Sequence, residues 1–417
     1  MTTPYYPQGC AAGSEVRRLA PAPAGYAWNV NLNNGNSNRN NQDNHSHVRA
    51  VRAGECQGAA SFHALYSAWR EARRGKKPST DQLDFDSSWT DRLLELQERL
   101  NSCTWTPSPP TCFIATAPKA REIHAPAFSD RVVHHYLVPK LEAIYERTFI
   151  HDSYSNRIGK GTHSAVRRLK SFVRQVSSGQ GNGHYLQLDI KNFFNSIHRP
   201  TLYTLLKPRM ERAGLPEHIR RAVHALLNHP IARTGVQWAC TDIERSIVPP
   251  HKRLENAAPG CGLAIGNLSS QFFANVYLDR LDQFVKHTLK AQRYLRYVDD
   301  FVIVHKDPEQ LEEWRKQIEA FLRTELRLEL KSDQQLAPLH QGIDFLGYVV
   351  FPSHTAVRRR VVASAREKLY EWRRSRGTFE QLQSFWSSYV GHFAHANSRR
   401  LMADFVRRFP WLARSAQ

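Results

Sequence analysis

The stretch 294-YLRYVDDFVIVHK-306 decides the fold, because it places two adjacent aspartates inside an apolar run. Most of the apolar residues are β-formers, and the run predicts two short buried strands. Asp is depleted in strands, and a buried carboxylate is costly unless something compensates its charge. An isolated Asp pair is explained by a β-turn between the strands. Whether Asp299 and Asp300 mark a turn or a chemical site depends on the rest of the chain.

A third carboxylate favours a site. Asp189 ends the apolar strand 185-YLQLDI-190, again an unusual position for Asp. Three carboxylates at strand ends converge if their strands are neighbours in one sheet. Two Mg²⁺ ions about 3.5–4 Å apart need such hard oxygen ligands to hold an in-line phosphoryl transfer. One ion lowers the pKa of an attacking 3′-hydroxyl and the other stabilises the leaving pyrophosphate. The metal charge would make the buried aspartates tolerable.

The composition indicates a polyanionic partner. The 417 residues are enough for two or three domains, and 41% are hydrophobic, which is enough for a core. Lys and Arg number 58 against 38 Asp and Glu, a net charge of +20 spread along the chain. Nucleic acid is therefore the first candidate partner. The alternative is a basic but otherwise ordinary enzyme.

Cysteine usage and hydropathy indicate the compartment. The six cysteines form no C-x-x-C pair, which argues against a zinc site and a disulfide framework and favours a reducing cytoplasm. No run of 18 apolar residues exists, and the N-terminus lacks the apolar core of a signal peptide. We expect a soluble, cytoplasmic protein without a membrane partner.

The first 55 residues differ from the rest. Nine Asn lie between Asn29 and Asn44, among almost no aliphatic residues, which predicts a flexible extension without regular structure. From residue 60 on, hydrophobic spacing predicts helices, strands and an irregular stretch at 215–262 that includes an exposed loop. The expected helices are 60–77, 91–100, 131–149, 161–176, 191–206, an amphipathic 267–289, and basic helices after 355; the expected strands are 184–190, a strand following a helix within 321–334, and a hairpin at 344–352.

From about residue 110 to 400 the sequence resembles the reverse transcriptases. The stretch 297-YVDD-300 looks like the family's Y-x-D-D turn, and 188-LDIKNFFNSI-197 looks like the palm strand with the first catalytic Asp. Further matches are 262-GLAIGNLSSQFFANVYLDRLD-282 beside the template and nucleotide, and 344-DFLGY-348 at the primer grip. The fingers of bacterial, group II intron-like enzymes are matched by 118-PKAREI-123, 128-FSDRVVHHYL-137 and 153-SYSNRIGKGTHSA-165.

The resemblance implies an α+β right-hand polymerase fold. Fingers and palm with an antiparallel sheet would occupy 56–352 and a helical thumb 353–417, after the extension at 1–55. The implied catalytic residues are Asp189, Asp299 and Asp300, which would hold two Mg²⁺ ions, with Mn²⁺ as an alternative. The backbone carbonyl of Ile190 would be a further metal ligand. A basic thumb would follow the duplex backbone, although a solvated charged face explains any single Arg there equally well.

The resemblance also assigns nucleotide-binding residues. Phe194 falls at the steric gate, where a bulky ring collides with a ribose 2′-hydroxyl, so the substrates would be dNTPs. In the core interpretation Phe194 is simply one of the apolar residues at a helix start. Lys119 and Arg121 would contact the triphosphate, or else form an ordinary surface basic pair.

Two further segments receive roles in the same way. Ile265, Gly266 and Gln271 would lie beside the incoming nucleotide, where the glycine allows close approach of the backbone. Gly347 and Tyr348 would support the primer 3′ end.

The departures from the family pattern carry information about its subgroup. Many reverse transcriptases have Gln before that glycine and Pro after Ser270, whereas this chain has Ile265 and Gln271. The version 265-IGNLSSQ-271 resembles the enzymes of diversity-generating retroelements, which copy an RNA template with frequent errors opposite adenine. Replacing a polar side chain with Ile would remove a hydrogen-bonding check on pairing geometry. A Lys that related polymerases often have near Gln334 is absent, which leaves the general acid unassigned.

The leading hypothesis is an RNA-directed DNA polymerase that copies an element-encoded RNA in a diversity-generating retroelement. An antiphage defence reverse transcriptase that copies a non-coding RNA is the alternative, followed by a group II intron maturase and by a catalytically idle RNA-binding scaffold. Expected partners are an RNA template, a DNA or RNA primer and dNTPs; a structured non-coding RNA and an accessory protein are further candidates. The gene would be bacterial or phage-encoded. The Asn-rich segment would overlap a template repeat or be a polar extension.

Overall fold

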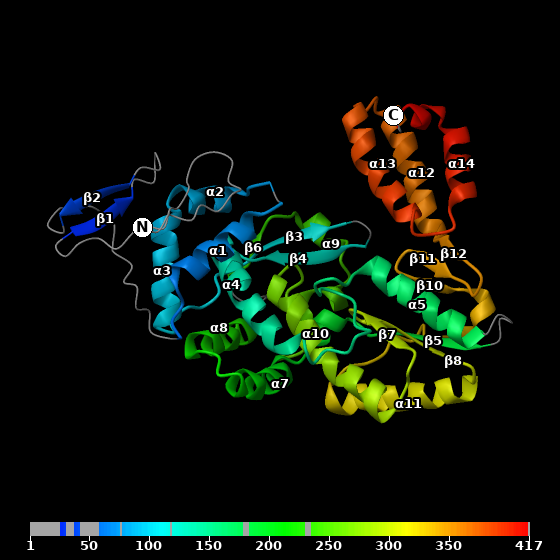
Figure 1. Cartoon of the computed structure of the whole chain (residues 1–417), viewed down its shortest axis with the longest axis horizontal. Coiled ribbons are helices and arrows are strands. Elements are labelled where there is room, and N and C mark those ends of the chain that lie inside the picture. The colour runs from blue at the N-terminus through cyan, green and yellow to red at the C-terminus, as the bar shows by residue number, and fades with distance from the viewer. Residues whose placement is uncertain are drawn as a thin grey trace, which may run out of the picture. The chain divides into compact units, whose positions relative to one another are not determined.

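The computed structural model describes residues 58–75, 77–116, 119–177, 183–229 and 235–415, and the backbone of 26–30 and 37–41. The chain divides into two compact units, Met1–Ala59 and Ala60–Gln417 (Figure 1). Within the described parts, no helix combines the length and the apolar character needed to span a membrane.

The Asn-rich region contains regular structure, contrary to the sequence-based expectation. Strands β1 (Tyr26–Val30) and β2 (Ser37–Asn41) pair antiparallel, with Tyr26 opposite Asn41. The reason is visible in the sequence of β1, YAWNV, where a β-forming residue stands at every second position. The high Asn content of the segment had hidden this alternation.

The second unit begins with helices packed around a first core. Helices α1 (Phe62–Arg73), α2 (Thr80–Ser87), α3 (Trp89–Asn101) and α4 (Phe128–Tyr145) belong to this part. The hydroxyls of Ser61 and Ser79 accept hydrogen bonds from the N-termini of α1 and α2, as good N-caps do. A small sheet in the order β4-β3-β6 follows, built from β3 (Thr111–Ala115), β4 (Arg121–Ala125) and β6 (Gln237–Trp238).

The main sheet has the strand order β7-β8-β5-β9, and all its pairs are antiparallel. Its strands are β5 (His184–Asp189), β7 (Tyr294–Tyr297), β8 (Asp300–His305) and β9 (Gln335–Pro338). Alternate residues enter two different cores: Leu186, Leu188 and Ile303 pack into the first core, while Tyr185 and Val302 pack into a second. Both faces of the sheet are therefore covered, which explains its nearly continuous apolar strands.

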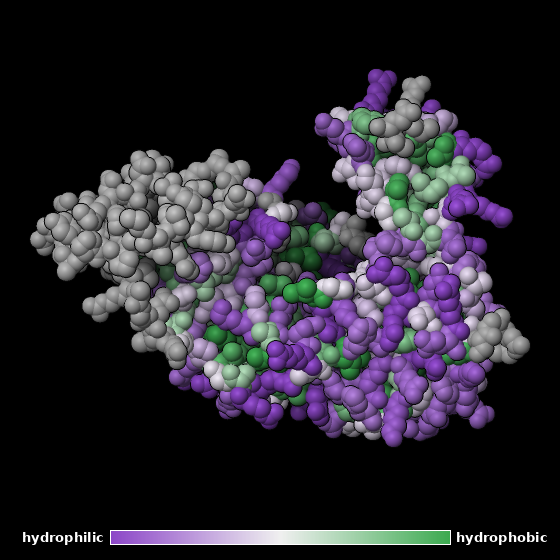
Figure 2. All heavy atoms as spheres, in the orientation of Figure 1, coloured by the Kyte–Doolittle hydropathy of each residue, from purple (hydrophilic) through white to green (hydrophobic). Residues whose placement is uncertain are grey.

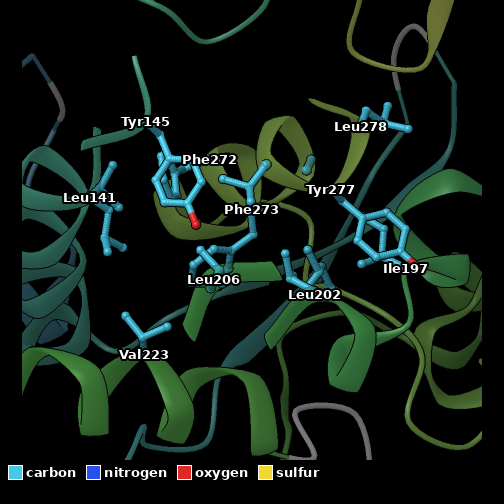
Figure 3. Close-up of a cluster of buried hydrophobic side chains, with 14 of the residues drawn as sticks. Leu141, Tyr145, Ile197, Leu202, Leu206, Val223, Phe272, Phe273, Tyr277 and Leu278 are labelled. Atoms are coloured by element: carbon cyan, nitrogen blue, oxygen red, sulfur yellow. The ribbon is translucent and has the colours of Figure 1, made fainter. Parts of the chain in front are cut away.

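Helices cover the two faces of this sheet. Helix α5 (Thr162–Ser177) contributes to the second core, and α10 (Leu268–Gln283) and α11 (Pro308–Glu325) contribute to the first. The first core also contains α6 (Phe193–Ser196), α7 (Arg199–Arg212) and α8 (Glu217–Asn228). Figure 3 shows its centre, where α4, α7, α8 and α10 meet through Leu141, Tyr145, Leu202, Leu206, Val223, Phe272, Phe273, Tyr277 and Leu278.

Two sequence-based expectations for this region were wrong. Residues 215–262 were expected to be irregular, but α8 has buried residues at helical spacing, from Ile219 to Leu227. Among the described residues 235–262 after α8, the regular elements are all short: the two-residue β6, α9 (Asp242–Ser246) and the 3₁₀ turns Pro250–Lys252 and Leu254–Asn256. Helix α10 is not amphipathic, because its polar Asn275 and Asp282 are buried along with its apolar residues. It continues as a π-helical turn, Phe284–Thr288.

The C-terminal part contains a small sheet and a helical bundle. Strands β10 (Ile343–Phe345), β11 (Tyr348–Val350) and β12 (Thr355–Val357) form an antiparallel sheet. Residues 355–357 had been expected to be helical. A third core is formed by three helices, α12 (Arg359–Arg374), α13 (Phe379–Phe393) and α14 (Arg399–Arg408). The 3₁₀ turn Pro410–Ser415 follows α14 and contributes Leu412 to this core.

These elements confirm the predicted α+β class, with an antiparallel central sheet and a helical C-terminal part. Figure 2 shows hydrophilic residues over most of the visible face of the second unit, interrupted by scattered hydrophobic patches.

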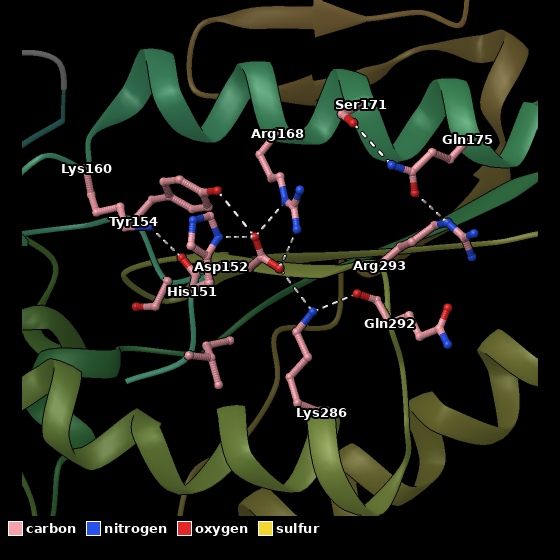
Figure 4. Close-up of polar contacts among 12 residues, drawn as sticks. His151, Asp152, Tyr154, Lys160, Arg168, Ser171, Gln175, Lys286, Gln292 and Arg293 are labelled. Carbon is pink, nitrogen blue, oxygen red and sulfur yellow. Dashed lines mark hydrogen bonds and ion pairs between the residues drawn. The ribbon is translucent and has the colours of Figure 1, made fainter. Parts of the chain in front are cut away.

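A buried polar network surrounds β7. Asp152 accepts hydrogen bonds from Arg168 of α5 at 2.8 Å and from Lys286 of the π-helical turn at 3.2 Å (Figure 4). Burial raises the pKa of the Asp152 carboxyl, but the hydrogen bond from Arg168 and the charge of Lys286 outweigh burial and lower it overall. The Asp152 carbonyl accepts a hydrogen bond from the backbone N–H of Arg296, at 2.9 Å. The network thus ties α5 and the π-helical turn to β7.

A buried ion pair involves Arg296, a residue of the same strand. The Arg296 side chain is 1% exposed and donates from Nε and Nη2 to the fully buried Asp282, at 2.8 and 2.7 Å. Tyr294 donates to the same carboxylate at 2.6 Å. Burial alone would lower the pKa of Arg296, but the charge of Asp282 raises it. Each charge is therefore tolerable only because the other is present.

Asp282→Asn is expected to lower the free energy of unfolding by about 3–5 kcal/mol, because it leaves the Arg296 charge buried without its partner. Urea unfolding monitored by circular dichroism measures this loss. Asp84→Asn is the matched control, because Asp84 and its partner Arg92 are exposed; its effect should stay within about 1 kcal/mol. Similar losses in the two variants would contradict this assignment.

Candidate active site

Three carboxylates meet where β5, β7 and β8 end. Asp189 is the last residue of β5 and lies directly opposite Asp300, the first residue of β8. Asp299 belongs to the two-residue turn that joins β7 to β8. The structure therefore brings Asp189, Asp299 and Asp300 together, and the Asp pair is both a turn and part of a charged cluster.

The turn between β7 and β8 is strained. Val298 has φ 55°, a left-handed conformation that β-branched residues adopt only under constraint. The buried Arg296 donates from Nη1 to the Val298 carbonyl at 2.8 Å, so the ion pair with Asp282 also fixes this turn. Strain of this kind is typical of functional sites, and here it sets the position of Asp299.

The backbone of β5 is held on its other side by the segment before β9. The Asp189 carbonyl accepts a hydrogen bond from the N–H of Lys331 at 2.9 Å, and Ile190 forms a bridge with Leu330. Successive carbonyls of a strand point to opposite sides. In the strand geometry the Ile190 carbonyl therefore faces the β8 side, where Asp300 lies.

Burial and mutual repulsion act on two of the carboxyl groups. Burial raises the pKa of Asp300 to about 7, and the charges of Asp189 and Asp299 add to the increase. The pKa of Asp299 is raised to about 6 by burial and by the charge of Asp189. Positive charge at this position would favour the ionised forms.

A lysine supplies part of that charge. The Lys331 ammonium contacts Asp189 Oδ2 and lowers the pKa of Asp299. Burial lowers the pKa of Lys331, but its hydrogen bond to Asp189 raises it above the ordinary value. Lys331 was not predicted from the sequence, because a lysine was expected near Gln334. The pattern that indicates it is the extended stretch 328-LELK-331, which pairs with the end of β5.

The donor set fits a divalent cation. Among the described side chains, Asp189 Oδ1 is one of the buried polar atoms without a hydrogen-bond partner, so a ligand atom is available. As they stand, the described residues contain no group of three or more His, Cys, Asp or Glu that could hold a metal ion. Since Lys331 contacts Asp189, a metal bound there would have to displace its ammonium. Carboxylate oxygens are the ligands that Mg²⁺ prefers.

The basic residues predicted to contact a triphosphate lie on the β3–β4 connection. Arg121 is the first residue of β4 and is paired with Ala115 at the closed end of this hairpin, and its charge lowers the pKa of Asp299. Lys119 is two residues ahead of Arg121, and its side chain is exposed. Arg121 therefore acts electrostatically on the carboxylates, while Lys119 projects from the connection into solvent.

The segment before α10 is attached to β4. The His124 N–H donates to the Ile265 carbonyl at 3.0 Å. Gly266 has φ 117°, and a Cβ there would lie 2.9 Å from the Ile123 side chain. Packing against β4 thus requires this glycine whether or not a nucleotide approaches it. Gln271 is partly buried in the first turn of α10.

Phe194 is the more accessible of two adjacent phenylalanines. Asn192 has φ 47° and turns the chain into the short helix α6. As a result Phe193 is buried in the first core, while Phe194 is only partly buried and contacts the Phe193 ring edge-on, with ring centroids 5.3 Å apart. Phe194 therefore packs against the first core and leaves part of its ring exposed.

The two residues predicted at the primer grip have different environments. Gly347 has φ 87° in the turn between β10 and β11, and Leu346 before it has φ 52°, as in a type I′ turn. The Tyr348 ring is fully buried and stacks on His392 of α13, with ring centroids 4.2 Å apart. The Tyr348 hydroxyl donates to the His392 carbonyl at 2.8 Å. Tyr348 therefore holds the hairpin on α13, while Leu346 and Gly347 of the turn are only partly buried.

The fold and the carboxylate cluster together define a polymerase-like palm. The family model for reverse transcriptase (RNA-dependent DNA polymerase) matches residues 114–350, more than half of the chain. The chain belongs to this family, whose members generally use divalent metal ions.

Two known proteins are similar in sequence. Protein YkfC of Escherichia coli (strain K12) is 23% identical over 276 residues, which cover 58% of this chain and 64% of YkfC. The group II intron-encoded protein LtrA of Lactococcus lactis subsp. cremoris is 23% identical over 329 residues, which cover 68% of this chain and 54% of LtrA. The chain thus matches between about half and two thirds of the length of these relatives.

Among solved structures, apo telomerase from Candida tropicalis, truncated from the C-terminal domain, is similar at a TM-score of 0.42 with 11% identity, over 60% of this chain and 56% of that chain. Telomerase from Candida albicans in complex with a fragment of telomeric RNA gives a TM-score of 0.40 with 12% identity, over 78% and 61%. The overall likeness is weak at these scores, and the family assignment rests on the sequence match.

Asp300→Asn should change how stability depends on pH in protein treated with a chelator. The folded-state pKa of Asp300 lies above the unfolded value, so the folded state binds more protons, and stability falls as the pH rises from about 4 to 7. The wild type should lose about 1–3 kcal/mol more than Asp300→Asn between pH 5 and pH 8, measured by urea unfolding. Asp84→Asn, at an exposed site, should behave as the wild type does. A parallel pH profile for Asp300→Asn would contradict the raised pKa.

Proposed function

We propose that this chain is an RNA-directed DNA polymerase that makes cDNA by metal-dependent phosphoryl transfer. The observation that carries the proposal is the ladder position of Asp189 opposite Asp300, with Asp299 in the adjoining turn, in a chain of the reverse transcriptase family. The substrates are dNTPs, an RNA template, and a DNA or RNA primer. The protein is expected to act in the cytoplasm and to be encoded by a bacterial or phage gene.

Asp189, Asp299, Asp300 and the Ile190 carbonyl would hold two Mg²⁺ ions, with Mn²⁺ as an alternative. The ions, when bound, supply a lower pKa for the primer 3′-hydroxyl and charge compensation for the leaving pyrophosphate. Arg121 and Lys119 would neutralise the triphosphate from the fingers. Lys331, once its ammonium leaves Asp189, becomes the candidate general acid for pyrophosphate, a role that the sequence alone left unassigned.

The remaining predicted residues position substrate and duplex. Phe194 would exclude the ribose 2′-hydroxyl, and Ile265, Gly266 and Gln271 would line the nascent base pair. The Gly347 turn would contact the primer, with Tyr348 anchoring it to the helical part. Under this proposal residues 1–55 form an extension, 56–352 the fingers and palm, and 353–417 a thumb whose basic helices follow the duplex.

The biological role that we favour is a diversity-generating retroelement, in which the template is an element-encoded RNA. Ile265 supports this role, because its apolar side chain offers no hydrogen bond to test the geometry at template adenines. The alternative is an antiphage defence enzyme that copies a structured non-coding RNA. In either role an accessory protein is a candidate partner. The Asn-rich segment would be a coding overlap with a template repeat in the first role only.

Phe194→Ala is expected to raise the use of rNTPs relative to dNTPs by roughly 10–100-fold, because the ring that would collide with the 2′-hydroxyl is removed. Primer extension on an RNA template, with kcat/KM determined for dNTP and rNTP, measures the ratio. Phe379→Ala is the control, since Phe379 is an exposed ring on α13. Unchanged discrimination in active Phe194→Ala enzyme would show that Phe194 is a core residue and no gate.

Expression with the native flanking DNA, followed by sequencing of copurified RNA and cDNA, tests the function itself. The wild type should yield cDNA that is absent from an Asp299→Ala/Asp300→Ala variant, with mismatches concentrated at template adenines. Faithful or repetitive cDNA from a non-coding RNA would instead support the defence role. The absence of cDNA from the wild type, with RNA still bound, would contradict the polymerase proposal and favour an RNA-binding scaffold.

A further inference from the structure

Gln187 connects two parts of the site that the chain separates widely. It lies two residues before Asp189 in β5, so the two side chains are on the same face of the strand. Its Nε2 donates to Asp300 Oδ1 at 3.1 Å, to Asp300 Oδ2 at 3.4 Å, and to the Asp344 carbonyl at 3.1 Å. Gln187 is not among the site residues predicted from the sequence.

The amide has the orientation that its partners require. The Asp344 carbonyl only accepts, and an ionised Asp300 carboxylate also only accepts. A primary amide has two N–H donors, one for each partner. The contacts to both Oδ1 and Oδ2 fix the orientation of the Asp300 carboxylate.

The other end of this connection is anchored to the β10–β11 hairpin. Asp344 belongs to β10, which is in a different sheet from β5. Its carboxylate pairs with Arg358 Nε at 2.8 Å, and the Arg358 N–H donates to the Gly347 carbonyl at 3.0 Å. The polar path therefore runs from Asp300 through Gln187 and Asp344 to Arg358, which also holds the hairpin turn.

We propose that Gln187 is a positioning residue that orients the Asp300 carboxylate toward a divalent cation and couples it to the β10–β11 hairpin. The inference rests on the proposed function, because it concerns the same metal-binding carboxylates. Groups that orient a metal ligand in this way usually contribute about 10–100-fold to metal affinity. The coupling means that an element placed to contact the primer also fixes the geometry of Asp300.

A Mn²⁺ titration of the full chain without dNTP tests the positioning role of Gln187. Electron paramagnetic resonance measures the concentration of the free ion. Gln187→Met keeps the volume and loses both donors, and it should weaken Mn²⁺ binding by about tenfold. Gln335→Met is the matched control, because Gln335 pairs with Gln187 across β5 and β9 but its side chain is exposed. It should bind Mn²⁺ as the wild type does. Affinity of Gln187→Met within twofold of the wild type would overturn the positioning role.

Gln187→Glu provides a second variant of the same shape if Gln187→Met does not fold. It replaces the donors with a carboxylate that no longer holds Asp300, so the bound Mn²⁺ should have a different geometry, seen as an altered spectrum of the bound ion. Wild-type affinity and an unchanged spectrum would overturn the proposal.

Repeating the titration with a primer–template duplex tests the coupling. The duplex should tighten Mn²⁺ binding to the wild type and to Gln335→Met several-fold, and this gain should be lost in Gln187→Met. An equal gain in Gln187→Met would overturn the coupling to the hairpin. If the wild type fails to bind the duplex, as fluorescence anisotropy would show, the proposed function fails and the coupling fails with it, while the titration without nucleic acid still decides the positioning role.

Discussion

The antiparallel ladder between β5 and β8 is the constraint on which the rest of the structure depends. Its register pairs Asp189 with Asp300. A shift of this register by one residue would turn one of the two carboxylates to the other face of the sheet, into a core. Two acidic groups at such a position repel each other and resist burial, as the raised pKa of Asp300 shows. The surrounding elements compensate this cost: Lys331 contacts Asp189, and the Gln187 amide contacts Asp300.

The ladder is kept in place by buried charges rather than by apolar packing alone. Arg296 joins Asp282 of α10 to the strained Val298, and Asp152 joins α5 to the backbone of β7. Arg296 lies on β7 next to the site and binds both Asp282 and the Val298 carbonyl, so the turn that carries Asp299 is tied to the ion pair. The buried charges thus hold one turn in an unfavourable conformation, as is common at functional sites.

The sequence was sufficient where chemistry leaves few alternatives. Aspartates at the ends of apolar strands are so unfavourable without a purpose that Asp189, Asp299 and Asp300 could be predicted together, and the order of motifs then gave the fold class. Contacts that depend on the neighbour across a sheet could not be predicted: Lys331 and Gln187 look like ordinary polar residues until β5 is paired on both sides. Likewise, the burial of the Tyr348 ring depends on α13, which is distant in sequence.

Anomalous diffraction from crystals soaked in Mn²⁺ tests the central claim most directly. We predict peaks within ligand distance of Asp189, Asp299 and Asp300, with the Lys331 ammonium moved away from Asp189. The peaks should be lost in Asp299→Asn/Asp300→Asn crystals soaked in the same way. Ordered wild-type crystals with no anomalous peak at these carboxylates, or with Lys331 still in contact with Asp189 at saturating Mn²⁺, would contradict the account.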